Sequence, residues 1–81
     1  MNDEICKNFA IKLKQIRKSK KMSQGKLSVE AECSKSYIGM IENGKKVPTL
    51  TIIASLSRAL NIHIKELFDF DYKLEDEFWS K

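Results

Sequence analysis

The stretch that decides the fold is Met22-Ser-Gln-Gly-Lys-Leu-Ser-Val-Glu-Ala-Glu-Cys-Ser-Lys-Ser-Tyr-Ile-Gly-Met-Ile-Glu-Asn-Gly44. It contains two short runs with helical spacing of apolar residues. Each run follows a serine, a residue type that caps the first turn of a helix. Ser23 is therefore expected to cap a helix over residues 24–31, and Ser34 is expected to cap a second helix over residues 35–43.

The two helices are expected to pack against each other around a tight turn. Glu32-Cys33 breaks the first run, and Gly44 is the residue type that commonly ends a helix in the left-handed conformation. The residues between the helices are small or apolar: Leu27, Ser28, Ala31, Cys33, Ile38 and Ile41. The outward positions are Lys35, Ser36, Gly39 and Met40, with Tyr37 at the margin. This is the pattern of a helix-turn-helix, whose second helix enters the major groove of DNA by its N-terminal end.

The rest of the chain also has helical spacing, and no convincing strand alternation occurs. An amphipathic helix is expected over residues 4–19, and a short helix over 64–68. Another helix begins after Thr49 and stops near Asn61. Its apolar residues share one face: Leu50, Ile53, Leu56 and Leu60. The sequence thus predicts an all-α, compact fold of five helices, with the helix-turn-helix formed by the second and third.

The charge is unevenly distributed along the 81 residues, whose length permits a single domain. Residues 1–68 hold 13 basic and 6 acidic side chains, giving +7, whereas residues 69–81 have a net charge of −3. A basic body favours a polyanionic partner such as nucleic acid. We therefore expect a helix-turn-helix DNA-binding domain over 1–68 and an acidic aromatic tail over 69–81.

The tail is rich in aromatic residues, namely Phe70, Tyr72, Phe78 and Trp79. So much apolar surface favours packing on the domain itself or on a dimer partner. A frayed terminus is the alternative.

Several classes of protein are excluded or disfavoured by the composition. No uncharged stretch is long enough for a membrane span, and the acidic N-terminus is unlike a signal peptide, so a cytoplasmic location is expected. Cys6, Cys33 and His63 are too few to form a structural zinc site. The cysteines are expected to be reduced thiols, at least one of them packed as a small hydrophobe. No nucleophile–base pair or phosphate-binding glycine loop is evident, so we expect no enzyme, cofactor or small-molecule ligand.

The sequence resembles the Cro and phage-repressor-type helix-turn-helix family, also called the Xre family. The resemblance covers residues 7–68 and rests on five segments in the family's order: Met22-Ser23-Gln24, Ser34-Lys-Ser-Tyr-Ile38, Ile41-Glu-Asn-Gly-Lys45, Pro48-Thr-Leu50, and Ala59-Leu60 through Leu67-Phe68. The small size with a short tail is similar to controller proteins of restriction-modification systems and to small phage repressors. The resemblance implies a lambda-repressor-like fold and binding to double-stranded DNA.

The resemblance also implies roles for individual residues. Lys35, Ser36 and Met40 fall where family members contact base edges. The positions implied to contact the DNA backbone are Arg17, Gln24, Tyr37, Asn43, Lys45 and Lys46. Arg17 and Glu42 match a structural ion pair beneath the DNA surface. Glu32 departs from the family's usual turn glycine, and should point away from the DNA.

The expected function is a transcription regulator that binds a pseudo-palindromic operator as a homodimer, with residues 34–43 in the major groove. The residues expected at the dimer interface are Ile62, Ile64, Leu67, Phe68 and Phe70. The alternative is an antitoxin-like or protein-interaction regulator that docks through its C-terminal tail. Enrichment of a motif from random DNA would distinguish the DNA-binding regulator from the protein-interaction alternative.

Overall fold

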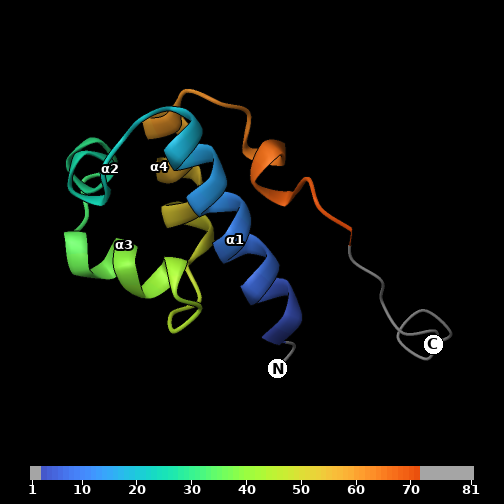
Figure 1. Cartoon of the computed structure of the whole chain (residues 1–81). Coiled ribbons are helices and arrows are strands. Elements are labelled where there is room, and N and C mark those ends of the chain that lie inside the picture. Colours follow the sequence, from blue (N-terminus) through green and yellow to red (C-terminus); the bar gives the residue numbers. More distant parts are fainter. Residues whose placement is uncertain (1–2, 72–81) are drawn as a thin grey trace, which may run out of the picture.

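The structure is a computed structural model in which residues 3–71 are described. Its elements, in chain order, are α1 (Asp3–Ser19), α2 (Gln24–Ala31), α3 (Lys35–Glu42), α4 (Leu50–Leu60) and the 3-10 helix η1 (Ile64–Phe68). The helix pair α2 and α3 lies to one side of α1, and η1 lies to the other (Figure 1). α2 packs against both α3 and α4, while η1 packs against α1 and α4. Every regular element in the described residues is a helix, as the sequence predicted.

Local hydrogen bonds fix where three of the helices begin, and they confirm the predicted caps. The Ser23 hydroxyl accepts a hydrogen bond from the Lys26 amide at 2.9 Å, and the Ser34 hydroxyl accepts one from the Tyr37 amide at 3.0 Å. Thr49 accepts from the Ile52 amide at 3.2 Å. Each cap satisfies one amide that the helix itself leaves without an acceptor.

Left-handed residues end α2 and α4. Glu32 follows α2 with φ 59°, and Asn61 follows α4 with φ 57°. After α3, the left-handed residue is Gly44, with φ 74°. All three positions were indicated by the sequence. Lys21, with φ 58°, was not, although it makes the turn that separates α1 from α2.

The fifth helix differs from the prediction. Residues 64–68 form a 3-10 helix, so the described chain has four α-helices and the count of five is not confirmed. Its first turn is held by the His63 amide, which donates to Glu66 Oε2 at 3.1 Å, and by the Glu66 amide, which donates to the His63 carbonyl at 2.9 Å. Five residues between two turns are too few to propagate the α-helical pattern, and short pieces of this kind favour the tighter helix.

The core lies where the four helices and η1 meet. Its fully buried side chains come from every element: Leu13, Leu27, Ile38, Ile41, Leu56, Leu60 and Leu67. Leu50 differs from the expectation that it shares the buried face of α4, since it is 82% exposed. It is the first residue of α4, and its side chain is exposed although Ile53 in the same turn is buried. Helical spacing alone therefore overestimated how far the core extends along α4.

Only the first residues of the tail lie within the described part of the chain. Phe70 is half-buried and packs against the core, next to Phe68 at a ring-centroid distance of 6.3 Å. Phe68 in turn lies 5.3 Å from the ring of Phe9 in α1. The expectations for Tyr72, Phe78 and Trp79 lie outside the described residues. Over residues 3–71, no helix has the length and apolar character that a membrane span requires.

Two leucines of α4 test where the core ends along that helix. Leu56→Ala removes a side chain that is 0% exposed, and should lower the free energy of unfolding by about 2–5 kcal/mol. Leu50→Ala, the matched control on the same helix, should change it by no more than about 0.5 kcal/mol. Urea denaturation followed by circular dichroism measures both. Equal losses for the two variants would contradict the assignment of Leu50 to the surface.

Candidate nucleic-acid interface

The outer face of α3 presents the side chains expected to read DNA bases. Lys35 and Ser36 are exposed in the first turn, and Met40 is half-buried one turn later. Ile38 and Ile41, on the opposite face, are almost completely buried. The helix therefore presents polar groups on the outside while its inner face anchors it to the core.

A buried ion pair joins α1 to the end of α3. Arg17 Nε donates to Glu42 Oε2 at 2.7 Å, and Arg17 Nη2 donates to Glu42 Oε1 at 3.0 Å. The side chains of Arg17 and Glu42 are only 8% and 1% exposed. Two parallel bonds between a guanidinium and a carboxylate fix the relative orientation of both groups. The structure thus contains the ion pair that the resemblance implied.

The same guanidinium also holds the turn before α2. Arg17 Nη1 donates to the Met22 carbonyl at 2.8 Å. The residue as a whole is 7% exposed, which leaves little guanidinium surface for a DNA phosphate. Arg17 is accordingly placed to position the interface, rather than to form part of its surface.

Gln24, at the start of α2, completes the network. Its Nε2 donates to Glu42 Oε1 at 3.0 Å, across 18 residues of sequence. Glu42 therefore accepts three hydrogen bonds, two from α1 and one from α2, although its side chain is almost fully buried. We call Arg17, Gln24 and Glu42 the clamp, because together they tie α1, α2 and α3 to one another.

The basic loop after α3 continues the polar surface. Asn43, Lys45 and Lys46 are exposed, while Tyr37 is half-buried and packs against the core. The Lys45 amide donates to the Met40 carbonyl at 2.8 Å, so the loop is held against the end of the helix. Asn43, Lys45 and Lys46 therefore lie at the surface beside the end of α3, whereas Tyr37 is only partly accessible.

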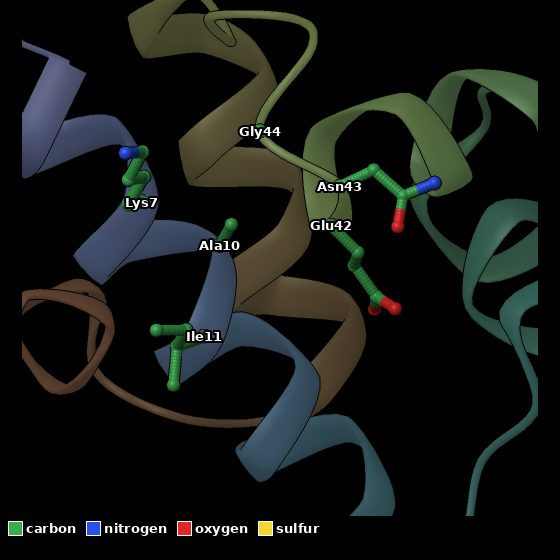
Figure 2. A pocket seen from close by; sticks show the side chains of 6 residues that line it. All are labelled: Lys7, Ala10, Ile11, Glu42, Asn43 and Gly44. Atoms are coloured by element: carbon green, nitrogen blue, oxygen red, sulfur yellow. The ribbon is translucent and has the colours of Figure 1, made fainter.

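A shallow pocket brings a further cation to the end of α3. It lies between α1 and the C-terminal end of α3 (Figure 2), and it is lined by Lys7, Ala10, Ile11, Glu42, Asn43 and Gly44. Lys7 is exposed and comes from α1. Sequence reasoning did not connect it with the end of α3, because Lys7 and Glu42 are more than 30 residues apart in the chain.

The turn between α2 and α3 accommodates Glu32 in place of the family's usual glycine. Glu32 adopts the left-handed conformation and is exposed. Cys33 is a half-buried free thiol packed against the core, and burial raises the pKa of its thiol above the usual value. A raised pKa keeps the thiol protonated and unreactive near neutral pH, which agrees with the expected packing role. Residues 3–71 contain no cluster of side chains that could hold a metal ion.

The residues expected at a dimer interface fall into two groups. Ile64 and Phe68 are 44% and 40% exposed, and Ile62 and Phe70 are half-buried. Leu67 is 0% exposed and belongs to the core of the protomer. Its burial follows from η1, which turns this one side chain towards α1 and α4. Leu67 is therefore not available to a partner.

Comparison with known proteins gives consistent matches. A family model described as helix-turn-helix matches residues 13–67. Control protein C.BamHI of Bacillus amyloliquefaciens is 41% identical over 71 residues, covering 86% of this chain and 88% of that protein. Control protein C.MunI of a Mycoplasma species is 38% identical over 69 residues, covering 84% of this chain and 92% of that protein.

A solved structure gives a similar result. The crystal structure of the restriction-modification controller protein C.AhdI from Aeromonas hydrophila matches with a TM-score of 0.77 and 33% identity. The match covers 78% of this chain and 96% of that one. These findings confirm the resemblance to helix-turn-helix regulators and controller proteins that the sequence indicated.

Breaking the clamp should destabilise the fold. Glu42→Ala leaves the Arg17 guanidinium buried without its carboxylate, and should lower the free energy of unfolding by about 3–5 kcal/mol. The double variant Arg17→Met with Glu42→Leu removes both charges, and should be more stable than Glu42→Ala. Urea denaturation of both variants measures the difference. A loss below about 1 kcal/mol for Glu42→Ala would show that the pair does not hold the helices.

Proposed function

Because the chain belongs to the helix-turn-helix family, we propose that it is a sequence-specific transcription regulator of the controller type that binds duplex DNA. The observation that supports this most directly is the arrangement of α3. Its first turn exposes the polar side chains of Lys35 and Ser36, while the clamp holds its other end to α1 and α2. A helix held in this way suits insertion into a major groove, where a fixed orientation is needed to match base edges.

The proposed base contacts are Lys35, Ser36 and Met40. The Lys35 ammonium suits the O6 and N7 acceptors of guanine, and the Met40 side chain suits the methyl group of thymine. The Ser36 hydroxyl can donate or accept, so it discriminates less between bases. All three lie on the exposed or half-buried face of α3.

The proposed backbone contacts are three exposed residues after α3 and one half-buried residue within it. Lys45, Lys46 and Asn43 follow the helix, and Tyr37 lies at its margin. Lysines of this kind bind phosphate as flexible point charges and release counterions from the DNA. Binding should therefore weaken steeply as the salt concentration rises. Selection of bound sequences from a random duplex pool tests the proposal, which fails if no motif is enriched.

We further propose that the protein acts as a homodimer on a pseudo-palindromic operator. The exposed apolar side chains of Ile64 and Phe68 on η1, with half-buried Ile62 and Phe70 beside them, support an interface there. A symmetric dimer would place two copies of α3 about one helical turn of DNA apart, roughly 34 Å.

Two lysines distinguish base reading from phosphate attraction. Lys35→Ala should cost about 1–3 kcal/mol of binding free energy and relax selectivity at one base pair. Lys46→Ala should weaken binding to all sequences alike and reduce the slope of log K against log salt by about 1. Binding-site selection and salt titration measure both effects. An unchanged base preference in Lys35→Ala would contradict the role given to Lys35.

The dimer proposal has a test on η1. Ile64→Glu places a charge on the proposed interface and should shift the protein towards monomer in sedimentation equilibrium. Ile11→Glu is the matched control, since Ile11 is 56% exposed but lies on α1 beside the end of α3. The control should leave the dimer intact. Dissociation in both variants, or in neither, would place the interface elsewhere.

A further inference from the structure

The orientation of the Gln24 side chain follows from its partner in the clamp. The Glu42 carboxylate only accepts hydrogen bonds when ionised, so the amide nitrogen of Gln24 must be the atom that faces it. The Gln24 Nε2 to Glu42 Oε1 distance is 3.0 Å. The two atoms of the amide group point in different directions, and Oε1 is therefore turned away from Glu42.

That oxygen is an acceptor without a partner inside the described part of the chain. No hydrogen bond to Gln24 Oε1 is formed by any of residues 3–71. Over the same residues, no buried side-chain nitrogen or oxygen lacks a hydrogen-bond partner. Gln24 Oε1 has no partner and is not one of the buried atoms, so it must reach solvent. Gln24 Oε1 is thus a solvent-accessible acceptor on a half-buried side chain, and a buried carboxylate fixes its orientation.

The oxygen lies over a gap in the surface of α3. A Cβ atom at Gly39 would stand 3.8 Å from Gln24 Oε1, with no other contact within 4 Å outside its own helix and neighbours. Gly39 lies one helical turn after Lys35 and directly before Met40. The gap therefore falls among the side chains proposed to contact bases.

Folding does not require glycine at this position. The only glycine with positive φ in residues 3–71 is Gly44, and a contact of 3.8 Å is an ordinary one for a methyl group. Glycine also weakens a helix relative to alanine, because it loses more backbone freedom on folding. The absence of a side chain at Gly39 thus favours a role in admitting something from outside the protomer.

We propose that Gln24 Oε1 accepts a hydrogen bond from the exocyclic amine of one base, adenine N6 or cytosine N4, and that the gap at Gly39 admits the edge of that base. The proposal rests on the proposed function, in which α3 occupies the major groove. Those two amines are the hydrogen-bond donors that adenine and cytosine present there. Glu42 is the positioning residue, since it determines which end of the amide faces the DNA. This role differs from the phosphate contact implied by the resemblance, because an acceptor oxygen does not bind a phosphate oxygen.

Removing the amine from the DNA tests the contact. After selection of a motif, each adenine of one half-site is replaced by purine and each cytosine by 2-pyrimidinone, which lack only the exocyclic amine. At one position the wild-type protein should lose about tenfold in affinity, as expected for one lost hydrogen bond. Gln24→Ala should bind the unmodified site more weakly and should be insensitive to the modification at that position.

Lys46→Ala is the control, since it weakens binding through a phosphate contact and should remain as sensitive to amine removal as the wild type. Circular dichroism establishes that Gln24→Ala is folded. If Gln24→Ala keeps the full sensitivity at every position, or if no amine removal affects the wild type, the inference is overturned. A wild-type protein that enriches no motif would instead overturn the proposed function.

Gly39→Ala tests the gap separately. The thermal midpoint should rise by a few degrees, because alanine is the better helix former and fits the space. Affinity for the selected site should fall about tenfold, while affinity for unrelated duplex DNA should stay within about threefold. A lower midpoint would make Gly39 a structural residue. A higher midpoint with unchanged affinity for the selected site would show that the gap admits no base.

Discussion

The structure depends on the constraint that a helix of eight residues must keep one orientation. α3 spans Lys35–Glu42 and is too short to be stable in isolation. Its inner face packs into the core, but apolar contacts are non-directional and tolerate rotation and sliding. The Arg17–Glu42 pair supplies the missing direction, since two hydrogen bonds between planar groups define both angle and distance. A further hydrogen bond, from Arg17 Nη1 to the Met22 carbonyl, extends the constraint to the turn before α2.

A buried ion pair is a costly way to gain stability. Removing two charges from water costs several kcal/mol per ion, and apolar residues of similar volume often serve stability equally well. The pair is tolerable here because Glu42 accepts a third hydrogen bond from Gln24, and because no described buried side-chain nitrogen or oxygen lacks a partner. What apolar residues could not supply is the orientation of the Gln24 amide. The clamp therefore links the stability of the fold to the polarity of the surface presented to DNA.

Features set by neighbouring residues could be predicted from the sequence, and those set by distant contacts could not. The caps at Ser23, Ser34 and Thr49 depend on amides three residues away, so their side-chain chemistry was sufficient. The exposure of Leu50 and the burial of Leu67 depend on what packs over each residue, which helical spacing does not report. The Arg17–Glu42 pair was implied only by family resemblance. Glu42 as the partner of Gln24 could not be predicted from the residues near either one.

Because Arg17 is buried, attraction of DNA and discrimination between bases are proposed to rest on other residues. A guanidinium that is 7% exposed has little surface for phosphate binding, so we propose that attraction of DNA rests on exposed lysines such as Lys45 and Lys46 on the loop after α3. Their long, flexible stems follow a phosphate backbone without needing one geometry. Discrimination between bases gains from the opposite property, namely a polar group whose orientation is fixed by its surroundings. The acceptor proposed on Gln24 has that property, because Glu42 holds its amide and the clamp holds the start of α2.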